Sequence, residues 1–366
     1  MSLTVKRLDS IEQADRNQWN HVVEQADLGS VFHRYGWLRA IERGQPLEPR
    51  HLLVEKKGNP IAISPNFVGS IGSVPIRRLY SIRPGSGGPI AMGDEEAALD
   101  LIFKSTARLC EGTVRFHQID NLDSPYVRYH DHFLEHGYSL RINNCHMLLD
   151  TTHDWETLLI EMDSSRRRAI RRGHDHDGTV VDEELTEEVL SEVHENYTEV
   201  AERVGEAVLP RSFFVELATL PERVKVFSLH VNGKRCGLML FVLDDEQSTV
   251  HYLRSAVTED HFQFNASELI HEYAIKWAIE NGYKTYNFRG AEPDFRNGLF
   301  RFKERFATRA APCLTWERGY PRAALAALNG GRVAHQWYTS STPVAPEAVR
   351  ERTAEIKSKV VGQIFS

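Results

Sequence analysis

The chain has little of what marks secreted and membrane proteins. It contains four cysteines in 366 residues, with no C-x-x-C pair and no short disulfide framework. This usage suits a reducing cytoplasm in which the thiols are buried. Residues 1–10 are polar and hold no apolar segment of the kind that a signal peptide requires. The most apolar run, residues 237–243, is far too short to cross a bilayer. We therefore expect a cytoplasmic protein without stable membrane insertion.

An excess of positive charge and the signatures of covalent catalysis are also missing. The net charge of −7 argues against general coating of nucleic acid, so any contact with a polyanion must be local. No Ser-His-Asp or Cys-His signature indicates a covalent intermediate. With 41% apolar and 26% charged residues, the composition is ordinary for a soluble protein that is long enough for two domains with separate cores.

The histidine-rich turns lack the spacing of metal ligands. Residues 174–177 read His-Asp-His-Asp between two glycines, and residues 130–132 read His-Asp-His. Adjacent side chains on a turn cannot converge on one ion without distant partners. The sequence therefore predicts no metal site, and we expect no cofactor.

Periodicity and turn residues predict alternating helices and strands in two similarly organised halves. The expected helices cover residues 15–25, 32–42, 94–110, 124–136, 155–173, 186–204, 210–220 and 265–281. The expected strands cover residues 4–8, 113–119, 138–149, 249–257 and 284–290, with hairpins over 50–68 and 224–243. This order predicts an α/β fold. We expect one domain over residues 1–150, a second over 151–320 and a helical C-terminal tail over 321–366.

The stretch 286–306, YNFRGAEPDFRNGLFRFKERF, combines a strand, a break and a short helix. The strand breaks at Arg289-Gly290, and the helix carries Lys303 next to Phe302. A cation held among aromatic rings after a strand suits contact with an anion. The alternative is an amphipathic helix whose basic side chains are only solvated.

Four arginines share one broad face of the helix expected over residues 155–173, and they stack in two i,i+4 pairs. They are Arg167, Arg168, Arg171 and Arg172. Guanidinium groups this close repel one another unless an anion or acidic residues lie opposite, which favours a phosphate or pyrophosphate site. A solvated helix end, where arginine also suits the helix dipole, is the alternative.

A glycine-rich loop follows the first hairpin, in the segment LYSIRPGSGGPIAM of residues 79–92. Gly85, Gly87 and Gly88 leave backbone amides unshielded, so the loop could receive a phosphate or a carbonyl oxygen. It lacks the Lys-Ser/Thr ending of a P-loop, and a tight Gly-Pro bend between strands explains the same residues. Asp120, just past a strand end, either stands where catalytic groups collect in open sheets or caps a turn.

From residue 265 to 306 the chain combines a helix, a strand NFRG at 287–290 and the segment GLFRFKERF at 298–306. This combination resembles the helix, the "DFxG" strand and the "GLxxFKxxF" ending of the FemAB-like branch of the GNAT superfamily. Asn287 stands where many relatives have Asp. Three other segments are similar to the family in part. SVFHRYGWLRAIE resembles its early Q-S-x-x-W helix, Gly-Gly-Pro at 87–89 its "GGP" strand, and RRAIRR at 167–172 its basic R-x-x-I-R-x-A helix.

The resemblance implies tandem GNAT-like domains, each a mixed twisted sheet flanked by helices, and transfer of an aminoacyl or acyl group onto an amine. It implies that Lys303 neutralises charge on the donor or on the tetrahedral oxyanion. We expect Asp120 to accept the amine proton, unless the substrate does so itself. Arg39 on the early helix either holds an acidic group of the acceptor or is an ordinary surface arginine. Together, the expected substrate-binding residues are Arg39, Gly87, Gly88, Arg167, Arg168, Arg171, Arg172, Arg289 and Phe302.

The segment before the helix at 265 bears on the donor. Acyl-CoA-dependent GNAT enzymes place a glycine-rich turn there, whereas residues 259–267 read EDHFQFNAS and contain no glycine. Asn265 and Glu268 also predict a capping box that would occupy the amides of this helix terminus. We therefore expect an aminoacyl-tRNA or another activated ester as donor, and an amine of a phosphorylated or cell-envelope precursor as acceptor. Two alternatives remain: an N-acyltransferase that uses acyl-CoA or a carrier-protein thioester, and a non-catalytic module that binds a phosphorylated ligand.

Overall fold

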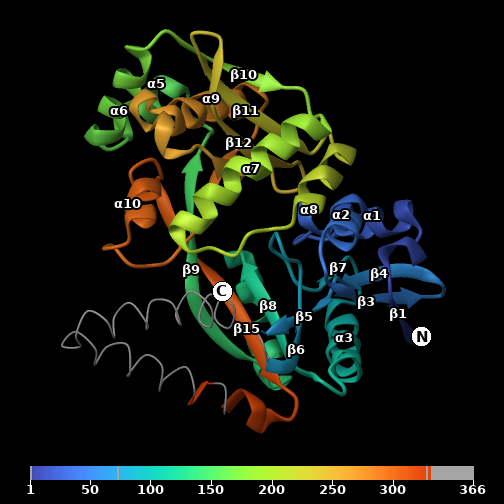
Figure 1. Ribbon diagram of the computed structural model, residues 1–366. Helices are drawn as coiled ribbons and strands as arrows, with labels where there is room; N and C mark the ends of the chain where they lie inside the picture. Colours follow the sequence, from blue (N-terminus) through green and yellow to red (C-terminus); the bar gives the residue numbers. More distant parts are fainter. Residues whose placement is uncertain (1, 72–73, 327–328, 331–366) are drawn as a thin grey trace.

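The computed structural model describes residues 2–71, 74–326 and 329–330 (Figure 1). Its strands form a small sheet in the order β1-β3-β4-β7 and a large sheet in the order β10-β11-β12-β13-β14-β9-β15-β8-β6-β5-β2. The strands are β1 (Leu3–Leu8), β2 (Glu48–Pro49), β3 (His51–Lys56), β4 (Asn59–Ser64), β5 (Phe67–Ile71), β6 (Val74–Tyr80), β7 (Ile90–Ala91), β8 (Val114–Leu122), β9 (Ser139–Asp150), β10 (Gly178–Glu183), β11 (Val224–Val231), β12 (Lys234–Asp244), β13 (Thr249–Ala256), β14 (Thr285–Ala291) and β15 (Arg309–Gly319).

Helices surround both sheets. The α-helices are α1 (Arg16–Gln25), α2 (Tyr35–Gly44), α3 (Glu95–Leu109), α4 (His130–Glu135), α5 (Trp155–Glu161), α6 (Ser164–His174), α7 (Glu187–Val204), α8 (Arg211–Glu216), α9 (Ala266–Glu280) and α10 (Gly298–Glu304). Short 3-10 helices are η1 (Ile11–Gln13), η2 (Val31–His33), η3 (Ser124–Tyr129), η4 (Leu217–Thr219) and η5 (Glu259–Phe264). Most of the expected C-terminal tail, residues 321–366, lies outside the described residues.

Both halves of the large sheet contain one parallel strand pair with a helix between the two strands in the chain. In the first half, β5 and β6 pair antiparallel, β6 and β8 pair parallel, and α3 lies between them in sequence. In the second half, β12 and β13 pair antiparallel, β13 and β14 pair parallel, and α9 lies between them. A parallel pair needs such a crossover. The two halves therefore repeat one arrangement.

The halves are joined through the sheet itself. Strand β9 pairs antiparallel with β14 on one side and with β15 on the other. Strand β15 then pairs with β8 of the first half, although it lies in the sequence range expected for the second domain. The sheet consequently runs without interruption from one half into the other.

Alternating residues of β11 and β12 face two different cores, as expected when helices cover both faces of a sheet. Val226 and Leu240 belong to the core that contains α7, whereas Phe227 and Phe241 belong to the core that contains α9. The first of these cores also includes α1, α2 and α3. The apolar interior therefore does not divide near residue 150 into two separate cores, because α7 and α8 bury their apolar sides against the first half.

One expected helix, over residues 155–173, is divided into α5 and α6. Asp163 interrupts it because its Oδ1 accepts a hydrogen bond from the backbone N–H of Ser165, at 2.8 Å, and so caps α6. The expected arginine cluster therefore lies on a separate helix of 11 residues.

The cysteine prediction is confirmed, since all four thiols are free and buried. In the described part of the chain, no helix combines the length and the apolar character needed to cross a membrane.

Candidate functional site

Lys303 lies on the buried side of α10. Asn297 caps this short helix, because its Oδ1 accepts hydrogen bonds from the backbone N–H groups of Leu299 and Phe300, at 2.9 and 3.2 Å. The ammonium of Lys303 donates to the carbonyl oxygen of Gly290 at 2.7 Å. That bond uses one of the three ammonium hydrogens.

Burial makes the charge on Lys303 unfavourable. The residue is 5% exposed, and desolvation lowers the pKa of Lys303 to about 7, with Glu206 opposing this shift and Arg289 and Arg254 adding to it. The ring centre of Tyr252 lies 5.6 Å from the lysine Nζ. A bound anion would favour the charged form again. Lys303 is therefore a candidate site for an anion or a developing oxyanion.

The strand that precedes α10 bends so that Gly290 comes within reach of Lys303. Arg289 has a φ of +59°, and the Oδ1 of Asn287 accepts a hydrogen bond from its N–H at 2.7 Å, which stabilises this left-handed conformation. A Cβ at position 290 would lie 2.4 Å from the Nδ2 of Asn144, so this position requires glycine. The register between β14 and β9 shifts between Asn287 and Gly290. The NFRG pattern thus encodes a local bulge.

Beside this bulge the strands β13 and β14 stop pairing. The parallel register covers only Thr249 with Thr285, Val250 with Tyr286, and His251 with Asn287. Both strands continue further, β13 to Ala256 and β14 to Ala291. Tyr252 and Arg254 lie on the part of β13 that pairs with β12 but no longer with β14, and both act on Lys303.

Arg289 connects this site to the glycine-rich loop of the first half. Its guanidinium donates to the carbonyl oxygen of Gly85 at 3.1 Å and to the hydroxyl of Ser86 at 3.3 Å. It also lies 4.9 Å from the ring centre of Phe32. Burial lowers the pKa of Arg289, while the negative charge of Asp123 opposes that shift. The structure therefore brings Lys303, Arg289 and the glycine-rich loop to the junction of the two halves.

The glycines of this loop are buried and closely packed. Gly87 has a φ of +143°, and a Cβ there would lie 2.5 Å from the ring of His33. A Cβ at Gly88 would lie 2.9 Å from Ile119. The N–H of Gly88 already donates to the hydroxyl of Tyr126 at 3.1 Å. Packing accounts for both glycines, and their role in substrate binding stays a prediction.

Asp120 adjoins the same loop, at the end of β8. Its N–H donates to the hydroxyl of Ser81 at 3.2 Å. Its carboxylate accepts hydrogen bonds from the Nε2 of Gln118 at 2.7 Å and from the hydroxyl of Thr315 at 3.3 Å. The partners of this carboxylate are thus side chains rather than the backbone amides of a turn.

A histidine–carboxylate pair that the sequence analysis missed lies close to Arg289. The Nδ1 of His146 is 2.9 Å from the Oδ1 of Asp123. The side chain of His146 is 2% exposed, whereas that of Asp123 is 50% exposed. His146 stands inside the apolar strand segment CHMLL, a signal that could have singled it out.

The two groups differ in their preferred protonation states. Burial lowers the pKa of His146 despite the opposing effect of Asp123, and the charges of Arg289 and Lys303 lower it further. Although 50% of the Asp123 side chain is exposed, the nearby protein atoms desolvate its carboxylate, and this effect alone would raise the pKa of Asp123. The hydrogen bond from His146 outweighs this effect and lowers the pKa of Asp123. At neutral pH the pair is a neutral imidazole whose Nδ1–H donates to a carboxylate.

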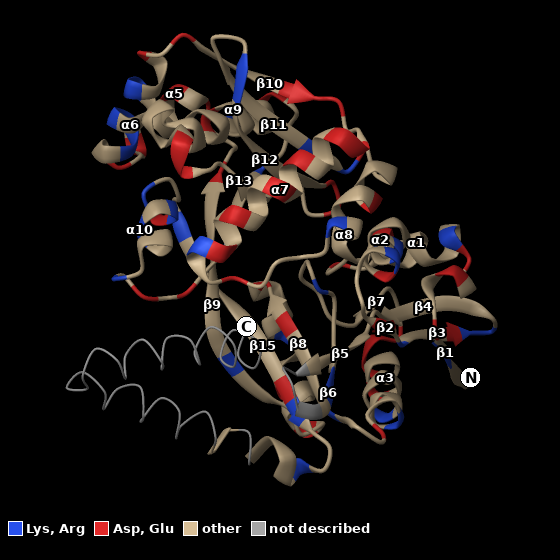
Figure 2. Ribbon diagram, in the orientation of Figure 1, with Lys and Arg blue, Asp and Glu red and all other residues tan. Residues whose placement is uncertain are grey.

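The four predicted arginines of α6 do not meet Lys303. Arg168, Arg171 and Arg172 are exposed, and Figure 2 shows basic residues along α6. Arg167 folds back and donates to the carbonyl oxygens of Ile160 and Met162.

The neighbouring Arg166, which was not predicted, is the arginine that faces α10. Its guanidinium lies 4.8 Å from the ring centre of Phe302 and donates to Glu268 at 2.6 Å. Arg166 precedes the buried Ile170 by four residues and the buried Gly173 by seven. That helical spacing would have placed it on the inner side of the helix.

Arg39 lies half-buried on α2, and its Nε is buried without a hydrogen-bond partner among the described residues. The structure gives it no contact, within the described ranges, to Lys303, Arg289 or the glycine-rich loop. A role for Arg39 in binding stays a prediction.

The capping box expected at the start of α9 is wrong. Asn265 has a φ of +51° and makes no side-chain capping bond, and Glu268 instead accepts a hydrogen bond from Arg166. The reason is that Asn265 also ends η5, where a left-handed residue is favoured, whereas an N-cap needs an extended one. This side chain therefore leaves the terminal amides of α9 unoccupied.

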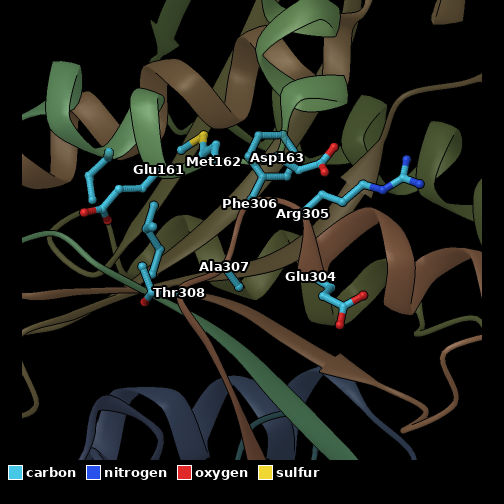
Figure 3. A pocket seen from close by; sticks show the side chains of 10 residues that line it. Glu161, Met162, Asp163, Glu304, Arg305, Phe306, Ala307 and Thr308 are labelled. Atoms are coloured by element: carbon cyan, nitrogen blue, oxygen red, sulfur yellow. The ribbon is translucent and has the colours of Figure 1, made fainter.

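A cavity of about 450 Å³ lies next to the C-terminal end of α10 (Figure 3). Its lining residues are Leu149, Leu158, Glu161, Met162, Asp163, Glu304, Arg305, Phe306, Ala307 and Thr308. No residue of the predicted site is among them. The cavity is consequently separate from the group around Lys303.

The model of the FemAB family matches residues 237–310, the span that contains Tyr252, Arg289 and Lys303. A search of curated proteins found no match.

Among solved structures, FemX is 14% identical with a TM-score of 0.66, over 85% of this chain and 96% of FemX. L-PGS from Bacillus licheniformis is 13% identical with a TM-score of 0.55, over 82% of this chain and 91% of that protein. A tandem GNAT protein from the clavulanic acid biosynthesis pathway is 10% identical with a TM-score of 0.52, over 87% of this chain and 98% of that protein. The expected α/β fold with tandem GNAT-like halves is confirmed.

Proposed function

We propose that this chain is an acyltransferase of the FemAB-like branch of the GNAT superfamily, and that it transfers an aminoacyl group from an activated ester to an amine of a phosphorylated or cell-envelope precursor. The observation that carries the proposal is the buried ammonium of Lys303, which lies beside the segments of β13 and β14 that no longer pair with each other. A buried lysine whose pKa falls to about 7 is poorly explained by stability alone, and such groups cluster at functional sites.

An aminoacyl-tRNA is the proposed donor. The exposed arginines Arg168, Arg171 and Arg172 lie on α6, which packs beside α10 through Arg166 and Phe302 (Figure 2). In a chain of net charge −7, these three side chains form a local basic surface on the helix whose Arg166 contacts α10. Contacts from exposed arginines to phosphates fix the position of a nucleic acid without reading its sequence.

In the proposed reaction, the acceptor amine attacks the carbonyl carbon of the donor ester. A C–N bond forms, the C–O bond to the donor breaks, the amine gives up one proton, and the leaving oxygen takes one. Negative charge develops first on the carbonyl oxygen and then on the leaving oxygen. The charged form of Lys303 would stabilise that charge, and its low exposure strengthens the interaction because little water screens it.

The proton of the amine needs an acceptor, for which we propose Asp120, with His146 as a second candidate. Asp120 already receives two hydrogen bonds, from Gln118 and Thr315. His146 is neutral at pH 7, and Asp123 holds its Nδ1–H, as in sites where a carboxylate orients a histidine base. The single-turnover rates of Asp120→Asn and His146→Gln identify which of the two residues the proton transfer requires.

The proposal is tested with purified protein, charged tRNA in one reaction and an acyl-CoA mixture in another, each with candidate amines. The proposal is supported if the protein transfers the aminoacyl group from charged tRNA and Lys303→Ala abolishes this transfer. The control Lys234→Ala, at an exposed position, should preserve it. A different outcome would favour a binding module: neither donor supports turnover, but the protein binds a ligand and Lys303→Ala weakens that binding.

An N-acyltransferase that uses acyl-CoA is the second candidate. It is favoured by one observation, the start of α9, where Asn265 makes no side-chain capping bond, because a helix N-terminus suits a pyrophosphate. The missing glycines of residues 259–267 count against it. Transfer from CoA alone would select this function.

A further inference from the structure

Helices α3 and α4 bring together three side chains that commonly bind metals. The Oδ1 of Asp100 lies 2.8 Å from the Nε2 of His136 and 3.6 Å from the Nε2 of His132. One donor atom from each of the three residues lies within 4.8 Å of the others. We propose that Asp100, His132 and His136 bind a divalent transition-metal ion, of which Zn²⁺ is the best fit.

The spacing of the donor atoms agrees with this assignment. Zn²⁺ binds histidine nitrogen and carboxylate oxygen at about 2.0–2.2 Å in tetrahedral geometry, so ligand atoms of one ion lie roughly 3.3 Å apart. The two distances from Asp100, 2.8 and 3.6 Å, lie on either side of that value. Two histidines and one carboxylate leave a fourth position for water or another ligand.

Packing holds both imidazoles in place. His132 and His136 are four residues apart, at the start and end of one helical turn, so their side chains project from the same side. Their ring centres lie 5.7 and 5.0 Å from that of the buried Phe103 on α3, and 4.9 Å from each other. The two rings are thus positioned before any ion binds.

His132 supplies an independent indication of a missing partner. Its Nε2 is buried and makes no hydrogen bond within the part of the chain that the structure describes. A buried polar atom without a partner costs about 1–3 kcal/mol, and coordination of an ion would satisfy it. The Nδ1 of the same ring lies 3.9 Å from a carboxylate oxygen of Glu135. A carboxylate near Nδ1 favours the His132 tautomer that carries its proton on Nδ1. In that tautomer the lone pair of Nε2 is free to bind a metal.

Lys104 does not block the site. Its ammonium donates to the Oδ2 of Asp100 at 2.9 Å, which leaves Oδ1 for the ion. The side chains of this pair are 67% and 40% exposed, and exposed pairs of this kind are weak.

The alternative is a clamp between two helices in which Asp100 only accepts a hydrogen bond from His136. That clamp explains the 2.8 Å contact but leaves the Nε2 of His132 without a partner. A metal ion explains both observations. The sequence indicates only part of this site, because His132 and His136 are one helical turn apart within the expected helix over residues 124–136, whereas Asp100 comes from another helix.

Zn²⁺ titration followed by calorimetry tests the proposal, using the full chain without a polyhistidine tag. We expect one ion per chain, and a loss of affinity in Asp100→Asn, His132→Gln and His136→Gln. Loss of a residue that only supports a ligand costs about 10–100-fold in affinity, so each of these changes should cost at least that much. His176→Gln, in the His-Asp-His-Asp turn, is the matched control and should bind Zn²⁺ like the original protein.

Two further measurements separate loss of the site from loss of the fold. Circular dichroism should be the same for all variants, and Zn²⁺ should raise the Tm only of the original protein and the His176→Gln control. Co²⁺ should give visible absorption bands typical of nitrogen and oxygen ligands, which disappear in His136→Gln. Equal Zn²⁺ affinity in all five proteins, or no binding at millimolar Zn²⁺, would refute the proposal.

Discussion

In the glycine-rich loop the backbone is packed against side chains, whereas at α10 a charged side chain is buried with one hydrogen bond to the protein. Gly87 lies against His33, and the N–H of Gly88 is used by Tyr126. Lys303 donates to Gly290 alone among the described residues.

The glycine-rich loop and Lys303 were both expected to contact an anion, but different physical effects explain why these residues are present. Glycines at positive φ or at close contacts are explained by the shape of the chain. A buried ammonium is not explained in that way, because desolvation opposes it and packing of an apolar side chain would be more favourable. Lys303 is therefore the stronger functional candidate of the two.

The largest expected effect comes from removing the charge. Lys303→Ala should reduce the rate of transfer by about 10²- to 10³-fold, the range found when one group that stabilises an oxyanion is lost. Single-turnover kinetics with the donor that supports transfer measures this effect, and circular dichroism checks the fold. A rate within about threefold of the original would show that the buried charge is structural, and would remove the contrast with the loop.

The loop should respond in stability. Gly87→Ala forces a side chain into a left-handed conformation and against the ring of His33, so the free energy of unfolding should fall by about 1–3 kcal/mol. Gly58→Ala is the matched control, because Gly58 has a φ of +81° but nothing within 4 Å of an added Cβ. Denaturant unfolding measures both variants. An equal loss in both would mean that packing against His33 adds nothing.

The pH dependence of kcat/KM should reveal the ionisation of Lys303. Since the charged form is the active one, activity should fall as pH rises through the pKa of about 7 in the free enzyme. Lys303→Arg should move this alkaline limb upward, because arginine stays protonated. One pH unit above this pKa, kcat/KM should be about tenfold lower than at its maximum. An unchanged limb in the arginine variant would assign it to another group.

The smallest effect is expected from the exposed arginines. Replacing Arg168, Arg171 and Arg172 by glutamine should raise the KM for charged tRNA several-fold at low salt, with less effect at high salt. The rate at saturating donor should change little, in contrast to Lys303→Ala. Filter binding and kinetics at two salt concentrations measure the difference. A change in rate without a change in KM would argue against a positioning role.

Local patterns predicted much of the fold. The polar turn at Lys57-Gly58 sets the first hairpin, and the expected helix over residues 94–110 agrees with α3. The pairing of Lys303 with Gly290 also follows from the chain near it, since the bulge at Arg289 and the cap at Asn297 both lie within a few residues. These features depend on neighbours in sequence.

Contacts between distant segments could not be predicted. One local signal was also missed, because Asp163 caps α6 inside a helix that was expected to be continuous. His146 meets Asp123 only because β9 passes beside the start of η3, and Asp100 meets His136 only because α3 packs near α4.

The sequence by itself determined the order of helices and strands, the bulge at Arg289 and the inward position of Lys303, because backbone preferences and side-chain periodicity act over a few residues. Only the tertiary structure decided which distant side chains meet. It joined Arg289 to the loop at Gly85, placed β15 between β8 and β9, and turned Arg166 rather than its neighbours toward Phe302. The reason is that periodicity reports which side of an element is buried, but not which partner covers it.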